Sequence, residues 1–195
     1  MCDTGNMVSQ RSLWTIGHST RAIDEFLELL HAHEIQLLVD IRTVPRSRRH
    51  PQFDTAALAR TLEKAGVAYL HMPSLGGLRK PRKDSINTGW RNPSFRGYAD
   101  YMQTKEFWKA VEDLIARAAI APSAIMCAEA VPWRCHRSLV ADALLSRGWD
   151  VRHITSRAEP SAHKLTPFAV IENGGLIYPQ PANSIGGSRL FPPGS

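Results

Sequence analysis

Short apolar runs alternate with longer segments of helical spacing along the chain, and this alternation constrains the fold more than any other feature of the 195 residues. The strand-like runs lie at residues 13–17, 36–41, 67–71, 124–127 and 151–154. Apolar residues recur at helical spacing in four segments, at residues 21–33, 54–66, 107–118 and 139–148. Strands that alternate with helices form right-handed βαβ units. The sequence therefore predicts an α/β fold with a mostly parallel five-stranded sheet and helices on both faces.

The remaining segments predict how the chain is divided. We expect one domain over residues 12–179, with flexible tails at 1–11 and 180–195. Within it, Asn173-Gly174 between two apolar runs predicts a β-hairpin over 168–178. Residues 72–97 are rich in Gly, Pro and basic side chains and predict an irregular insertion. We expect this insertion to cover the site as a lid, or to pack permanently through Trp90 and Phe95.

Composition excludes several classes of protein. No run of about 18 apolar residues is present, so we expect no contact with a membrane, and the first residues do not resemble a secretory signal. Three cysteines, one of them Cys2, are too few and too unevenly spaced for a disulfide framework. We therefore predict a cytoplasmic protein.

The charge favours an anionic partner without choosing one. The formal net charge is +6, and the basic residues gather in two segments. The first contains Arg42, Arg46, Arg48 and Arg49, and the second contains Arg79, Lys80, Arg82, Lys83 and Arg91. Either segment also has the composition of an ordinary solvated loop.

Polar residues follow four of the predicted strands at the point where each strand ends. They are His18 and Ser19, then Asp40 and Arg42, then His71, Gly76 and Gly77, then Cys127 and Glu129. In an open parallel sheet, ligands bind beyond the carboxyl ends of the strands. We therefore expect these residues to meet at one polar, Arg-rich cleft. Each has a structural alternative, such as a helix cap at Ser19 or an ion pair between Asp40 and Arg42.

The segment from Cys127 to Arg137 leads from a strand into a helix. Such a loop presents backbone N–H groups and the positive end of the helix dipole, and Arg134 and Arg137 add forked donors for phosphate or carboxylate. The same field lowers the pKa of a thiol, which makes Cys127 and Cys135 candidate thiolates. Free cysteines also pack as small buried residues, and that alternative stays open.

Cys127, Cys135 and His136 are residue types that bind zinc. We nevertheless predict no metal site, because adjacent Cys135 and His136 at the start of a helix are expected to point in different directions. A metal-dependent or redox role for these three residues remains an alternative.

Several short motifs together resemble one bacterial family, the "domain of unknown function 488". They are Thr15-Ile16-Gly17-His18-Ser19, Asp40-Ile41-Arg42 with Pro45 and Ser47, Leu75-Gly76-Gly77, Cys127-x-Glu129, Cys135-His136-Arg137, and near the end of the domain His163 to Ala169 with Tyr178-Pro179. The resemblance spans about residues 12–179. It implies a compact α/β domain of intracellular proteins without an established activity, some members of which are labelled as DNA repair proteins. It also implies a shared site made of His18, Ser19, Asp40, Arg42, Glu129, Cys135, His136 and Arg137.

Three functions are compatible with these observations. The first is an enzyme, or an enzyme-derived binding protein, for a small phosphate-bearing or nucleotide-like ligand. In it Arg42 and Arg137 would hold the anion, and Glu129 or His136 would transfer protons. The second is a nucleic-acid-binding accessory protein that uses the basic loops with Trp90 and Phe95. The third is the metal or thiol role above; the sequence identifies no cofactor and no oligomeric state.

Overall fold

A computed structural model describes residues 11–172 and 174–181, and it has the predicted mixed α/β architecture. A six-stranded sheet has the order β3-β2-β4-β1-β5-β6. The strands are β1 (Ser12–Gly17), β2 (Leu37–Asp40), β3 (Ala68–His71), β4 (Ser123–Cys127), β5 (Asp150–Ile154) and β6 (Ser161–Ala162). The first five are parallel to their neighbours, and β6 runs antiparallel to β5. Because the strands are parallel, their carboxyl ends meet at one edge.

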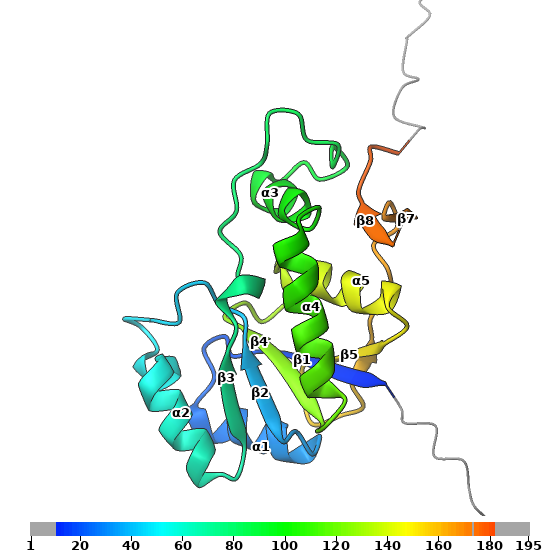
Figure 1. Cartoon of the computed structure of the whole chain (residues 1–195). Coiled ribbons are helices and arrows are strands. Elements are labelled where there is room, and N and C mark those ends of the chain that lie inside the picture. Colours follow the sequence, from blue (N-terminus) through cyan, green and yellow to red (C-terminus); the bar gives the residue numbers. More distant parts are fainter. Residues whose placement is uncertain (1–10, 173, 182–195) are drawn as a thin grey trace, which may run out of the picture.

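Helices cover both faces of the sheet, as predicted, and α4 crosses one face in Figure 1. The helices are α1 (Ile23–Ala32), α2 (Thr55–Lys64), α3 (Pro93–Tyr101), α4 (Lys105–Ala118) and α5 (Arg137–Ser146), with short 3₁₀ turns η1 (Pro51–Phe53), η2 (Pro73–Leu75) and η3 (Pro132–Arg134). One buried core joins Leu13, Val39 and Ile125 to α3, α4 and α5. A second core joins Ile16, Leu38 and Met126 to α1 and α2. Burial on two faces explains why these strands read as continuous apolar runs.

Two elements were not predicted. The irregular insertion was expected to reach residue 97, but α3 begins at Pro93, where the Asn92 side chain accepts a hydrogen bond from the Ser94 N–H. Asn at the cap position followed by Pro at the first helical position is typical of the start of a helix. The surrounding Gly and Arg residues hid this pattern in the sequence. The sixth strand, β6, consists of two exposed residues without an apolar pattern, so only five strands were predicted.

The insertion after β3 is tied to the rest of the molecule. The Trp90 ring packs against Phe95 at 4.7 Å and Phe168 at 5.0 Å between centroids. Asn87 is buried, donates to the Asp100 carboxylate and accepts from the Tyr178 N–H. The insertion is therefore ordered through Trp90 and Asn87 in this structure.

The predicted hairpin near the carboxyl end is present as β7 (Val170–Glu172) and β8 (Gly175–Ile177). The expected tails, 1–11 and 180–195, lie largely outside the described residues, as does Cys2. Over the ranges 11–172 and 174–181, no helix combines the length and apolar character needed to cross a membrane.

Candidate functional site

A cleft of about 620 Å³ opens at the carboxyl edge of the sheet, where β1, β2 and β4 end. This volume is typical of sites that bind small molecules. Its lining consists of His18, Ser19, Thr20, Arg42, Thr43, Val44, Arg46, Ser47, His50, Gly77, Leu78, Cys127, Ala128, Glu129, Ala130 and His136. The predicted convergence of three strand ends therefore occurs in space, with the loop after β3 contributing Gly77 and Leu78.

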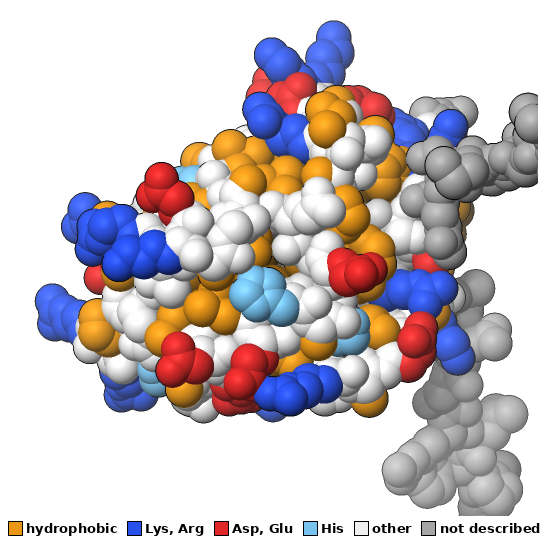
Figure 2. Space-filling model, turned by 90° about the horizontal axis from the view of Figure 1, so that it is seen from below, with side chains coloured by type: hydrophobic (Ala, Val, Ile, Leu, Met, Phe, Trp, Pro, Cys, Tyr) orange, Lys and Arg blue, Asp and Glu red, His pale blue; other side chains and the backbone are white. Residues whose placement is uncertain are grey.

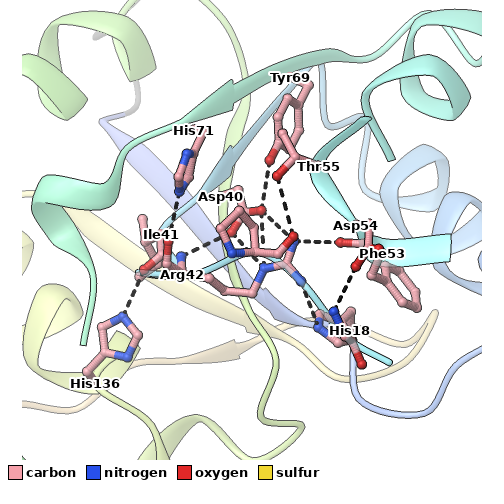
Figure 3. A network of polar contacts seen from close by, with 12 residues as sticks. His18, Asp40, Ile41, Arg42, Phe53, Asp54, Thr55, Tyr69, His71 and His136 are labelled. Carbon is pink, nitrogen blue, oxygen red and sulfur yellow. Dashed lines mark hydrogen bonds and ion pairs between the residues drawn. The ribbon is translucent and has the colours of Figure 1, made fainter. Parts of the chain in front are cut away.

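A buried ion pair lies under the cleft, between the Asp40 carboxylate and the Arg42 guanidinium (Figure 3). The Arg42 Nη2 donates to Asp40 Oδ2 at 2.6 Å and to the Phe53 carbonyl at 2.7 Å, and its Nε donates to Asp40 Oδ1 at 2.9 Å. The Tyr69 hydroxyl also donates to Asp40 Oδ2, at 2.8 Å. Most of the Arg42 fork is thus directed into the protein, and Nη1 is directed at His18.

His18 is held rather than free, because both of its ring nitrogens have partners. The Arg42 Nη1 lies 3.3 Å from Nε2, and since arginine can only donate, Nε2 accepts. Nδ1 therefore carries the proton and donates to the Ser19 carbonyl at 2.9 Å. Burial, which leaves the side chain 3% exposed, lowers the pKa of His18 to about 4, and the Arg42 charge adds to this. His18 is a neutral positioning residue at this site.

Cys127, Cys135 and His136 form a second group at the floor of the cleft, called here the Cys–Cys–His cluster. The Sγ atoms of Cys127 and Cys135 lie 3.9 and 3.6 Å from the Nδ1 of His136. All three atoms lie within 4.8 Å of one another. The expectation that Cys135 and His136 point in different directions is wrong. Cys135 has extended backbone and His136 has helical backbone, so the chain turns between them and brings both side chains to one point.

The two thiols are linked electrostatically. A hydrogen bond from Cys127 lowers the pKa of the Cys135 thiol to about 3, and contacts with His136 and the charge of Arg137 act in the same direction. The same link to Cys135, together with burial, raises the pKa of Cys127. Cys135 is therefore the more acidic of the two thiols.

Arg137 lies behind the cluster and does not line the cleft. It is 1% exposed, and its Nη2 donates to the Glu129 and Ala130 carbonyls at 2.5 and 3.3 Å. In the described part of the chain it forms no ion pair, and its Nε has no hydrogen-bond partner. The charge of Arg137 lowers the pKa of both thiols.

The start of α5 offers fewer free donors than the sequence suggested. The N–H groups of Ser138, Leu139 and Val140 donate to the carbonyl oxygens of Cys135 and His136. The start of α5 therefore leaves few backbone N–H groups free for a ligand.

Two glycines around the site are required by close packing, and a third borders His136. A Cβ on Gly17 would lie 2.0 Å from the Glu129 carbonyl oxygen, and one on Gly76 would lie 2.5 Å from Thr43 Oγ1. A Cβ on Gly77 would lie 3.1 Å from the His136 Nδ1. Gly17 thus lets the loop after β4 approach β1, while Gly77 leaves the space beside His136 open.

The predicted site residues divide into three groups. Those that line the cleft are His18, Ser19, Arg42, Gly77, Cys127, Glu129 and His136. Cys135 and Arg134 line a smaller neighbouring cavity of about 200 Å³, which shares Gly77, Glu129 and His136 with the cleft. The third group, Asp40, Gly76 and Arg137, is buried and lines neither of these two cavities.

Sequence reasoning missed several residues of the site. Thr43, Ser47 and His50 line the cleft, and Arg46 was noted only as part of a charge cluster. Tyr69 was missed as the donor to Asp40. The position of residues 43–50 directly after a strand was the signal that could have identified them, because this loop lies at the carboxyl edge.

The two basic segments differ in structure. Arg48 and Arg49 are exposed beside the cleft, whereas Arg82 pairs with Asp84 and Arg79 stacks on the Tyr101 ring at 3.8 Å. On the face shown in Figure 2, Lys and Arg side chains stand at separate edges with acidic and uncharged side chains between them. This face carries no continuous basic surface.

Comparison with known families gives one match. The model described as "Domain of unknown function DUF488" matches residues 22–144, more than half of the chain. The matched range includes Asp40, Arg42 and the whole Cys–Cys–His cluster, but not His18 or the segment from His163 onward. No curated protein and no solved structure matches the chain.

Proposed function

The chain belongs to the family described as domain of unknown function DUF488, and on that premise we propose a function from the site itself. We propose that the protein is an enzyme, or an enzyme-derived binding protein, that takes a small phosphate-bearing or nucleotide-like anion into the cleft. The observation that carries the proposal is the cleft of about 620 Å³, in which three strand ends meet in polar side chains.

The charges around the cleft support an anionic ligand. Arg46 is exposed at the lining and has no ion-pair partner within the described residues, so its full charge is available. Arg42 is largely neutralised by Asp40, and Arg137 is buried behind the loop. In this proposal Arg46 contacts the anion, assisted by Ser19 and Ser47 as neutral donors, and Arg42 holds the cleft in shape.

The reacting groups are at the other side of the same cleft. Glu129 is exposed there and is the carboxylate in position to transfer a proton to or from the ligand. The Cys–Cys–His cluster supplies the second chemical group, acting either as a free thiolate or as a set of metal ligands. The geometry of the cluster favours metal binding.

The test is thermal-shift and calorimetric titration with inorganic phosphate, a sugar phosphate and a nucleoside monophosphate. At least one of them is expected to stabilise the protein, since a ligand that binds only the folded state raises its stability. Arg46→Ala is expected to weaken binding by roughly tenfold to a hundredfold, the effect of losing a charge-assisted hydrogen bond.

Arg117→Ala is the matched control, because Arg117 is an exposed arginine on α4 and lies outside the cleft lining. The proposal fails if none of the three anions stabilises the protein, or if the two arginine variants bind equally well. Binding of DNA with a steep salt dependence, in place of these small anions, would support the nucleic-acid hypothesis instead.

A further inference from the structure

The Cys–Cys–His cluster has the donor atoms and the shape of a metal site. We propose that Cys127, Cys135 and His136 bind a divalent transition metal of the zinc class, through two sulfur ligands and the Nδ1 of the imidazole. The proposal rests on four features of the cluster: its distances, the orientation of the imidazole, the direction of the two thiols and the open side that faces the cleft.

The distances fit tetrahedral coordination. Bond lengths of about 2.3 Å to sulfur and about 2.0 Å to nitrogen place sulfur and nitrogen ligands about 3.5 Å apart at tetrahedral angles. The two Sγ atoms lie 3.6 and 3.9 Å from Nδ1, and no pair of the three atoms is further apart than 4.8 Å.

The imidazole already has the orientation and tautomer that a metal requires. The His136 Nε2 lies 3.2 Å from the Ile41 carbonyl oxygen, which can only accept, so Nε2 carries the proton. In the neutral form of the ring, this leaves Nδ1 without a proton and facing the two sulfur atoms. A hydrogen bond from the second ring nitrogen to a backbone carbonyl is the usual support of a metal-bound histidine.

Hydrogen bonding alone does not account for the cluster. The two sulfur atoms and Nδ1 converge on one point, where hydrogen bonds can join these electron-rich atoms only in pairs. A metal ion among the three atoms satisfies all of them, and two thiolates cancel its charge of +2. Cys135 is 5% exposed, so its sulfur atom is also shielded from bulk water.

The cluster has three protein ligands, and its remaining side is open. Cys127 and His136 line the cleft, and the missing side chain of Gly77 leaves space next to Nδ1. Three protein ligands with an open position are typical of catalytic zinc, whereas structural zinc has four. A bound metal would present its fourth position to a water molecule or an anionic oxygen in the cleft.

The test uses the full chain, reduced and purified without chelator. Elemental analysis is expected to find about one zinc-class ion per chain. After removal of the metal, titration with Co²⁺ is expected to give the near-ultraviolet absorption of cobalt–thiolate bonds and intense visible bands of tetrahedral cobalt, both reaching a plateau at one equivalent. The same titration is expected to protect two thiols from a thiol reagent.

Cys127→Ser, Cys135→Ser and His136→Gln should each lose the plateau, while Cys2→Ser, which removes the third cysteine, should retain it. Circular dichroism checks that each variant folds, and the wild-type titration remains decisive if one does not. Reduced wild-type protein that neither contains metal nor gives cobalt–thiolate absorption would overturn the proposal, and so would a plateau that survives the loss of both cysteines. Neither measurement requires an anion, so this inference and the proposed anion binding can fail separately.

Discussion

Asp40 and Arg42 are two residues apart, yet their side chains form a closed ion pair beneath the cleft, with 2.6 Å between Oδ2 and Nη2. The backbone N–H of Arg42 donates to the same carboxylate at 3.0 Å, so the pair also fixes the turn that follows β2. Through its remaining nitrogen and its carbonyl oxygen, Arg42 contacts His18 and His71. The pair therefore joins the ends of β1, β2 and β3 into one rigid base.

Asp40→Asn should destabilise the protein strongly, because it leaves the buried Arg42 charge without a counter-ion. Loss of one partner of a buried pair costs about 3–5 kcal/mol. Urea unfolding is expected to show a decrease of that size in the free energy of unfolding. Tyr69→Phe removes only the neutral donor to the same carboxylate and should cost about 1 kcal/mol. Equal losses in the two variants would contradict the assignment of Arg42 as a buried charge that depends on Asp40.

Gly17→Ala should displace the loop after β4. The new Cβ would lie 2.0 Å from the Glu129 carbonyl oxygen, a backbone atom that must move to make room. We expect a loss of about 1–3 kcal/mol in the free energy of unfolding, typical of overpacking, together with weaker anion binding in the cleft. Gly175→Ala is the control, since its Cβ would meet its nearest neighbour at 3.5 Å. If Gly17→Ala binds and unfolds like this control, the close approach is not needed.

The fold was predictable because its signals are local. The apolar runs that became β2 and β4 are buried on both faces, and the last residues of two predicted helical segments, Gly66 and Gly148, have φ of +73° and +77°. The helix α3 was missed because its apolar contacts are made with distant segments. Tyr98, for example, is buried and donates to the carbonyl of Leu75.

The sequence predicted where the residues of the site meet in the fold, but not how their side chains are oriented. The rule that ligands bind at the carboxyl edge brought His18, Arg42, Cys127 and His136 together correctly. The direction of each side chain was not accessible, because it depends on partners distant in sequence. The Ile41 carbonyl orients His136 from 95 residues away, and the carbonyls after β4 hold Arg137 beneath the surface.

Asp142→Ala should loosen the segment between β6 and β8. The Asp142 carboxylate is fully buried and accepts hydrogen bonds from His163 at 2.8 Å, Thr166 Oγ1 at 2.7 Å and the Tyr178 hydroxyl at 3.0 Å. Its loss leaves several buried donors unpaired, for a cost of about 2–5 kcal/mol. Limited proteolysis is expected to cut the variant between residues 163 and 178 faster than wild type. Tyr178→Phe, which removes one donor, should cost about 1 kcal/mol and leave the cleavage rate almost unchanged.

His153 should make the protein less stable in mild acid. Its Nδ1 accepts from the Thr15 hydroxyl at 2.8 Å, and its Nε2 donates to the Nδ1 of His163 at 3.0 Å, which in turn donates from Nε2 to Asp142. A neutral His153 satisfies every member of this chain. Burial, together with the facing His163 and the charge of Arg137, lowers the pKa of His153 from 6.5 to about 4.

The sign of the pH dependence follows from this depressed pKa of a basic group. Between pH 6.5 and 4 the unfolded chain binds a proton at this residue and the folded chain does not, so acid favours unfolding. The contribution of His153 is complete above pH 6.5 and is lost as the pH falls towards 4, for a total of about 3 kcal/mol.

Urea unfolding at a series of pH values should show this loss in wild type and a smaller one in His153→Gln. Thr15→Val is the control, because it removes a hydrogen bond and keeps the titrating ring; it should lower stability at every pH and retain the slope. Parallel curves for wild type and His153→Gln over this range would show that the acid sensitivity has another source.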